Sequence, residues 1–135
     1  MGQIKEDYKQ IVALANEARR RAYAPYSNYP VGAALRTTGG HIYTGVNIEN
    51  AAYPTGICAE RVAVFKAVSE GERDFEVIAV VTENGGSPCG ACRQVLSEFG
   101  LDTIVLIADG KGTILQEIKV RELLPEAFLP KHVQK

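Results

Sequence analysis

All three cysteines of this 135-residue chain lie in two short stretches that are far apart in the sequence. Cys89 and Cys92 are three residues apart, so on a helix their side chains share one face. Cys58 stands at the start of a run with helical periodicity that ends at Gly71. Pro88 is typical of a first helical turn, which places the Cys89 pair at a helix N-terminus. Two helix N-termini could bring the three thiols together, and the positive end of a helix dipole lowers the pKa of a thiol.

Three thiolates suit a catalytic zinc site, in which the protein supplies three ligands and leaves a fourth position for water. Glu60 follows Cys58 by two residues and could face that water without being a ligand. Zinc lowers the pKa of such a water to about 7, and a neighbouring carboxylate can then help to generate hydroxide. The sequence therefore predicts one Zn²⁺ per chain, held by Cys58, Cys89 and Cys92.

Other interpretations of the cysteines stay open at this point. A lone CxxC pair is also typical of structural zinc sites and of redox pairs. A structural site normally has four ligands, so His41 or His132 would have to be the fourth. A thioredoxin-type motif needs only two cysteines and leaves Cys58 unexplained. Glu60 by itself could be a solvated helix residue, and only its spacing from Cys58 singles it out.

The composition is that of one globular domain, which we expect over residues 1–135 because 46% of them are hydrophobic. A net charge of -1 offers no basic surface for nucleic acid, and no apolar run is long enough for a membrane helix. The first residues show no signal-peptide pattern. Three cysteines do not suit a disulfide framework, so we expect a cytoplasmic protein.

Hydrophobic periodicity and turn residues predict an alternation of helices and strands. The expected helices share a period of 3.6 residues and cover residues 4–23, 58–71 and 88–99. The expected strands cover residues 31–38, 41–48, 75–82, 103–108 and 113–120. A short helical or turn segment is expected over residues 121–128, before a loosely ordered tail.

The last two strands are joined only by the turn at residues 109–112, so they must be antiparallel, because a parallel crossover needs a dozen or more residues. The continuous apolar run at residues 75–82 is typical of a central strand covered on both faces. We therefore predict an α/β fold with three α/β/α layers and a mixed sheet of about five strands. The zinc would lie near the carboxyl ends of strands, where such sheets usually bind ligands.

Two polar or aromatic segments could contact a ligand. Asn47 and Glu49 alternate, so both face one side if the strand continues, and an amide beside a carboxylate can bind vicinal hydroxyls. The alternative is ordinary turn chemistry at a strand end. The loop at residues 23–30 is dense in tyrosines, which either pack over the sheet edge or flank a flat ligand.

These residues closely resemble the small cytidine deaminases. The resemblance covers nearly the whole chain and is carried by Cys58-Ala59-Glu60-Arg61, by Pro88-Cys89-Gly90-Ala91-Cys92-Arg93-Gln94, by residues 23–27, 31–35, 47–53 and 122–125, and by Phe128. It implies the cytidine-deaminase fold and hydrolysis of cytidine and deoxycytidine to uridine and deoxyuridine plus ammonia, for pyrimidine salvage. In the wider superfamily a glutamate that is not a ligand acts as acid and base.

The resemblance also implies roles for individual residues. It places Cys58, Cys89 and Cys92 on zinc and makes Glu60 the proton shuttle. The residues that it places on the nucleoside are Asn47 and Glu49 at the ribose, with Tyr29, Ala59 and Phe128. It implies a homotetramer in which Phe128 covers the pyrimidine of a neighbouring subunit; a core anchor is the alternative. Where the family commonly has Phe stacking near the base, this chain has Tyr29, whose hydroxyl needs a partner.

Arg61 follows Glu60 on the first expected ligand helix. Three thiolates carry more negative charge than one Zn²⁺ balances, so something must draw charge from the sulfurs. The helix N-termini supply part of this, and Arg61 could donate to a ligand sulfur as an outer partner. The alternative is an exposed arginine paired with Glu70 or another surface acid.

Three rival functions remain at the level of the sequence. Deaminases of nucleic acid or free bases place a helix between the last two strands, and the turn at residues 109–112 leaves no room for one. A deaminase of a cytosine-bearing nucleoside antibiotic shares both zinc motifs, although Asn47 and Glu49 favour an ordinary ribonucleoside. The third rival is a structural or redox zinc module without catalysis.

Overall fold

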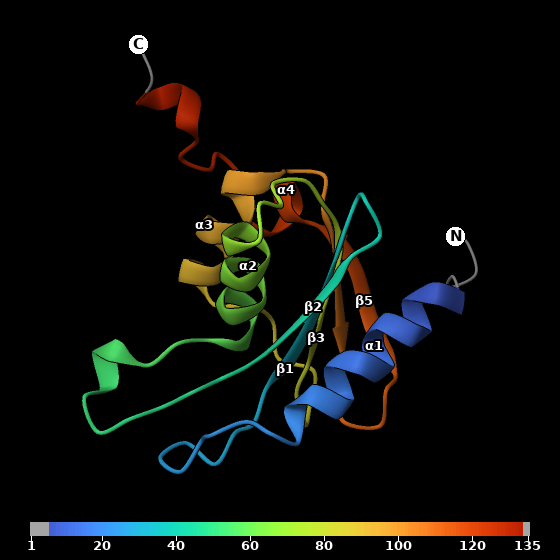
Figure 1. Ribbon diagram of the computed structural model, residues 1–135, viewed down its shortest axis with the longest axis vertical. Coiled ribbons are helices and arrows are strands. Elements are labelled where there is room, and N and C mark those ends of the chain that lie inside the picture. The colour runs from blue at the N-terminus through green and yellow to red at the C-terminus, as the bar shows by residue number, and fades with distance from the viewer. Residues whose placement is uncertain (1–5, 134–135) are drawn as a thin grey trace.

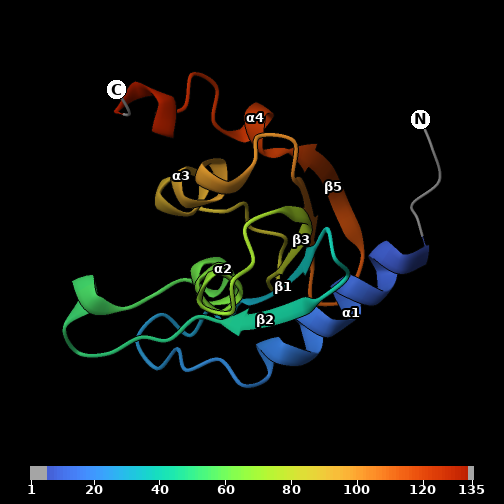
Figure 2. The same cartoon turned by 45° about the horizontal axis from the view of Figure 1, so that its top comes forward.

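The computed structural model describes residues 6–133 and has three layers (Figure 1). Helix α1 (Glu6–Arg19) covers one face of a five-stranded sheet, and α2 (Ala59–Ser69) and α3 (Gly90–Phe99) cover the other. Figure 2 shows the sheet between these two helical layers from a second direction. The predicted α/β/α architecture is confirmed.

The sheet is mixed, with β3 (Phe75–Val81) at its centre. Its strand order is β2 (Ile42–Val46), β1 (Gly32–Thr37), β3, β4 (Ile104–Ala108) and β5 (Ile114–Lys119). The β3–β4 pair is parallel, and the other neighbouring pairs are antiparallel. The antiparallel β4–β5 pair confirms the prediction made from the short turn between them.

Alternate residues of β3 supply two separate hydrophobic cores. Ile78 and Val80 pack in the core under α2 and α3, whereas Val77 and Ala79 pack in the core under α1. All four side chains are almost fully buried. Both faces of this strand are therefore covered, as its continuous apolar sequence predicts.

Glycines allow two helices to approach the sheet closely. A Cβ atom on Gly45 of β2 would lie 2.4 Å from the carbonyl oxygen of Ala59, at the start of α2. A Cβ atom on Gly32 of β1 would lie 2.0 Å from the carbonyl oxygen of Ala15 in α1. Since no side chain fits at Gly45, the first turn of α2 rests directly on the sheet and its N-terminus is fixed there.

Several predicted boundaries are wrong. Helix α1 ends at Arg19 rather than residue 23, because Tyr23 forms a β-bridge with Ile48; its predicted start at residue 4 lies outside the described residues. Pro88 lies before the helix rather than in its first turn, because Cys89 is the N-cap of α3. Strand β2 ends at Val46, before Asn47.

The C-terminal part is short and turn-rich. Helix α4 (Val120–Leu123) follows β5 directly, and a 3₁₀ turn at Pro130–His132 gives the predicted loose tail some regular structure. Beyond α4 this segment extends away from the sheet (Figures 1 and 2). Among the described residues, no helix has the length and apolar character needed to cross a membrane.

Candidate active site

The three cysteines come together at two helix starts. Cys58 is the N-cap of α2, Cys89 is the N-cap of α3, and Cys92 lies in the first turn of α3. Their sulfur atoms all lie within 4.8 Å of one another, with 3.8 Å between Cys58 and Cys89 and 3.6 Å between Cys89 and Cys92. None of the three forms a disulfide. Three free sulfur donors grouped in this way fit the donor set of a zinc ion.

Neither histidine joins this group within the described residues. The ring of His41 pairs with Glu72, and the Nδ1 atom of His132 accepts a hydrogen bond from the backbone of Leu129. A closed site with a histidine as fourth ligand is therefore not formed. Three protein ligands with one position left over are typical of a catalytic zinc site.

The thiols of Cys58 and Cys92 differ in acidity because they share a hydrogen bond with each other and have different neighbours. The pKa of Cys58 falls to about 5, chiefly through the hydrogen bond from Cys92 and further through that from Arg61. The pKa of Cys92 is raised by the same hydrogen bond and by burial. The protein thus prepares Cys58 as a thiolate, which is the form that binds metal.

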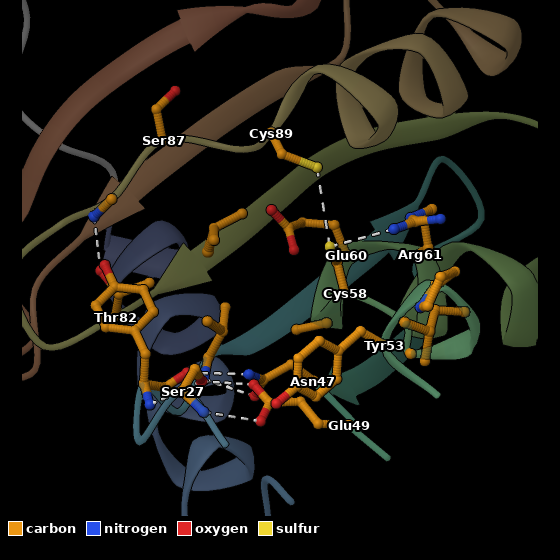
Figure 3. Close-up of a pocket in the computed structure, with 18 residues that line it drawn as sticks. Ser27, Asn47, Glu49, Tyr53, Cys58, Glu60, Arg61, Thr82, Ser87 and Cys89 are labelled. Atoms are coloured by element: carbon orange, nitrogen blue, oxygen red, sulfur yellow. Dashed lines mark hydrogen bonds between the residues drawn. The ribbon is translucent and has the colours of Figure 1, made fainter. Parts of the chain in front are cut away.

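Glu60 lies in the first turn of α2, and its side chain is only 5% exposed. Burial raises the pKa of its carboxyl to about 7, and the nearby Cys58 adds to the rise. Figure 3 shows Glu60 beside Cys58 and Cys89 at one end of a pocket of about 510 Å³. A carboxyl group placed here can exchange protons with a molecule that enters the pocket.

Arg61 contacts the same sulfur cluster from the other side. One of its terminal nitrogens donates to the Sγ atom of Cys58 at 3.3 Å, as Figure 3 shows, while its Nε atom is buried with no hydrogen-bond partner among the described residues. The hydrogen bond to Cys58 raises the pKa of the guanidinium further above its ordinary value. The cation therefore stays next to a thiolate, where it draws negative charge from the sulfur.

Asn47 and Glu49 lie at the other end of the pocket, although they do not continue the strand. The Asn47 amide accepts from the backbone of Val31 and donates to the carbonyl of Tyr29. Glu49 accepts from the hydroxyl of Ser27, and this hydrogen bond is the main reason why the pKa of its carboxyl is lowered. Both side chains therefore hold the loop before β1 and leave an ionised carboxylate in the pocket wall.

The other predicted nucleoside-binding residues are not all in one place. Tyr29 lines the pocket, and its hydroxyl donates to Asn84 at 2.7 Å. Ala59 lines the pocket at the start of α2. Phe128 is not among the lining residues; its side chain is 59% exposed and its ring lies against His132. Within one chain, Phe128 is neither a core anchor nor part of this pocket.

Sequence reasoning missed part of the pocket wall. Among the lining residues that it did not single out, the polar or aromatic ones come from three loops: Ser27, Tyr53, Thr82 and Ser87. Ser87 could have been found, because it directly precedes the second cysteine motif. Thr82 could not, because its position reads as the last residue of a buried strand.

Comparison with known proteins places this chain in one family. A family model described as the cytidine and deoxycytidylate deaminase zinc-binding region matches residues 5–108. The chain belongs to this deaminase family. It is therefore a zinc-dependent hydrolase, and its zinc ligands are to be sought among the three clustered thiols.

Individual relatives agree with this assignment. The chain is 51% identical over 125 residues to a cytidine deaminase of Sporosarcina psychrophila, a match that covers 90% of this chain and 91% of the relative. It is 34% identical to a blasticidin-S deaminase of Bacillus cereus, over 90% of this chain and 92% of that one. A solved cytidine deaminase from Burkholderia pseudomallei has a TM-score of 0.85 and 42% identity, and the match covers 93% of this chain and all of that chain.

Proposed function

We propose that the protein hydrolyses cytidine and deoxycytidine to uridine and deoxyuridine with release of ammonia, as a cytoplasmic enzyme of pyrimidine salvage. The observation that carries the proposal is that the two ends of the pocket bear different chemical groups. Three thiols and the buried Glu60 lie at one end, and Asn47 and Glu49 lie at the other. A nucleoside matches this arrangement, because its reactive amidine and its sugar hydroxyls are at opposite ends.

The chemistry at the thiol end follows from the residues there. We propose Cys58, Cys89 and Cys92 as the ligands of the zinc ion, which supplies a Lewis acid for the activation of water. Glu60 takes one proton of the attacking water, whose oxygen bonds to carbon 4 of the pyrimidine ring, and delivers that proton to N3. It then moves the proton of the new hydroxyl on carbon 4 to the amino group, so that the carbon–nitrogen bond breaks, ammonia departs and a carbonyl remains. Ala59 and Glu60 both line the pocket and are almost fully buried.

The charges in the pocket favour a nucleoside over a nucleotide. Among the described lining residues the only Lys or Arg side chain is Arg61, and it is engaged with Cys58. A phosphate on the sugar would therefore meet the Glu49 carboxylate without a free cation to balance it. We infer that cytidine is accepted and cytidine monophosphate is rejected, although the matching family includes deaminases of both kinds.

An absorbance assay tests the proposal directly. The zinc-loaded protein should lower the ultraviolet absorbance of cytidine and of deoxycytidine, with ammonia formed in equal amount. Free cytosine and cytidine monophosphate should react very poorly, because the site's polar groups would be left unpaired or repelled. Blasticidin S serves as the competing substrate. Turnover of that antibiotic without turnover of cytidine, or equal rates with cytosine and cytidine, would reject the proposal.

We further propose that the chain acts as a single domain and assembles as a homotetramer with shared active sites. A single sheet carries both cores and supports both ends of the pocket, which supports the single domain. Exposed apolar side chains, including Tyr53, Phe65 and Phe128, support an assembly that covers them. A cytoplasmic setting suits an enzyme whose three ligands must remain reduced thiols.

A further inference from the structure

Two loops on different walls of the pocket are joined by one side-chain hydrogen bond. The first loop precedes β1 and carries Tyr29, and the second connects β3 to α3 and carries Asn84. The Tyr29 hydroxyl donates to the Oδ1 atom of Asn84 at 2.7 Å, across 55 residues of sequence. In Figure 3 the labelled Ser27 belongs to the first loop and Ser87 to the second. Both loops line the same pocket.

The second loop is shaped around this hydroxyl. A Cβ atom at Gly86 would lie 2.6 Å from the Oη atom of Tyr29, so no side chain could stand there without displacing the ring. The backbone N–H of Gly86 donates to the hydroxyl of Thr82, a buried residue at the end of β3. Asn84 accepts the hydrogen bond of Tyr29 and Gly86 leaves room for its hydroxyl. The hydrogen bond from Gly86 to Thr82 fixes this loop to the sheet.

The tyrosine is also fixed at its other end. Its backbone N–H donates to the Ser27 hydroxyl, and its carbonyl accepts from the side chain of Asn47. The half-buried ring therefore spans from the groups proposed to hold the sugar to the loop that leads to Cys89. A phenylalanine at this position could fill the same space but could not form the second anchor.

We propose that Asn84 is a positioning residue for the nucleoside, and that its hydrogen bond with Tyr29 fixes the width of the slot that receives the pyrimidine ring. This inference rests on the proposed function, because it concerns the same pocket. A slot that is fixed before binding costs less ordering when the substrate enters, so the bond should affect binding rather than the chemical step. A neutral hydrogen bond of this kind corresponds to a factor of about 2 to 10 in an equilibrium constant.

The test is a double-mutant cycle on the zinc-loaded full chain, with Tyr29→Phe, Asn84→Ala and the two combined. Each single change should raise the KM for cytidine and the Kd for the product uridine about 2- to 10-fold while kcat stays nearly constant. The combined variant should be no worse than the weaker-binding single variant, because each change removes the same bond. Asn84→Asp should keep KM and Kd near their native values, since it retains an acceptor oxygen for the Tyr29 hydroxyl. Tyr43→Phe, which removes a hydroxyl outside the pocket, is the matched control.

Three results would overturn the inference: unchanged KM and Kd in both single variants, effects that multiply in the combined variant, or a fall in kcat with KM unchanged. Zinc content and melting temperature are measured for every variant, so that a misfolded loop is not mistaken for a binding effect. The proposed function is judged separately, by turnover of cytidine in the native protein. If the native protein turns over cytidine but the effects of Tyr29→Phe and Asn84→Ala are independent, only the proposed role of the Tyr29–Asn84 hydrogen bond is rejected.

Discussion

Glu60 and Arg61 are neighbours in the sequence, and the start of α2 gives their charged groups opposite surroundings. Glu60 is enclosed, and burial raises the pKa of its carboxyl. Arg61 reaches around to Cys58, which supplies the acceptor for one of its terminal nitrogens. The spacing of the motif is enough to predict that both residues lie near the metal ligands. Which of the two is enclosed depends on how α2 rests on the sheet, and the sequence does not state that.

A substitution of Glu60 should separate metal binding from chemistry. Glu60→Gln removes the group that carries protons but keeps its size, so zinc should stay at one per chain while the rate of cytidine deamination falls at least about 100-fold. Metal analysis beside steady-state rates measures both. Cys89→Ser is the matched comparison and should lose zinc. Loss of zinc from the glutamate variant, with the cysteine variant still loaded, would contradict these assignments.

Arg61 should tune the metal site without holding the metal. Arg61→Ala removes the donor to Cys58, so the sulfurs pass more negative charge to the metal and water is activated less readily. The rate should fall, and the pH of half-maximal rate should move upward. Arg61→Gln should recover part of the loss, because it keeps a donor without the charge. Rate–pH profiles of the three proteins, with zinc content, measure this; superimposable profiles would show that Arg61 has no such role.

The role of Glu49 at the sugar can be tested by comparing two substrates on the same variant. If Glu49 binds the 3′ hydroxyl, the native enzyme should process 3′-deoxycytidine much less efficiently than cytidine, because the substrate then lacks the hydroxyl that donates to this carboxylate. Glu49 also accepts hydrogen bonds from Tyr26 and Ser27, so any variant there loosens the loop. The ratio of kcat/KM for the two substrates cancels that loss. The ratio should approach one in Glu49→Ala, and an unchanged ratio would place the hydroxyl elsewhere.

At the scale of helices and strands, the sequence predicted the order and type of the main elements, because hydrophobic periodicity and turn residues largely decide both. The run in β3 and the short turn before β5 are the clearest cases. The errors occur where contacts distant in sequence decide. Tyr23 leaves the helix to pair with Ile48, and Pro88 lies before α3, whose N-cap is Cys89, rather than in its first turn. The Tyr29–Asn84 contact joins two loops that are far apart in the sequence, and no local sequence pattern predicts such a pair.

The start of α3 is held by one side chain that the sequence motif contains but does not explain. The guanidinium of Arg93 donates to the carbonyls of Pro88 and Leu123 and to the hydroxyl of Ser87, each at 2.8 Å. It thereby fastens the loop before Cys89 to the end of α4. The planar fork of arginine suits three acceptors in this arrangement, and lysine cannot reproduce it.

Removal of this clamp should weaken both the fold and the metal site. Arg93→Ala should lower the free energy of unfolding by about 2–3 kcal/mol and speed zinc release to a chelator, because three charge-assisted bonds are lost. Arg93→Lys should recover only part of either loss. Arg73, which donates to two backbone carbonyls on the surface, is the matched control, and Arg73→Ala should cost less than about 1 kcal/mol. Equal losses in the two alanine variants would show that the position of Arg93 is unimportant.

At the scale of the whole molecule, two segments of the chain carry exposed aromatic side chains. The segment between β2 and α2, with Tyr53 70% exposed, and the segment after α4 both extend from the body (Figures 1 and 2). The C-terminal segment is held to α3 because the side chain of Gln94 donates to the carbonyl of Phe128. The backbone of Phe128 is therefore fixed, while its aromatic side chain stays exposed. Such a residue is suited to contact a partner surface.

The proposed assembly can be tested by separating the aromatic ring from the segment that carries it. Light scattering of the native protein should give the mass of four chains. Phe128→Ala should remain a tetramer, because its backbone bond to Gln94 is kept, but its KM for cytidine should rise about 10-fold or more, as for an aromatic anchor lost from a binding site. Mixing that variant with Glu60→Gln should then restore activity, because a mixed tetramer contains sites that combine an intact Glu60 from one chain with Phe128 from another. A fully active monomer, or mixed tetramers with no more activity than the separate variants, would exclude shared sites.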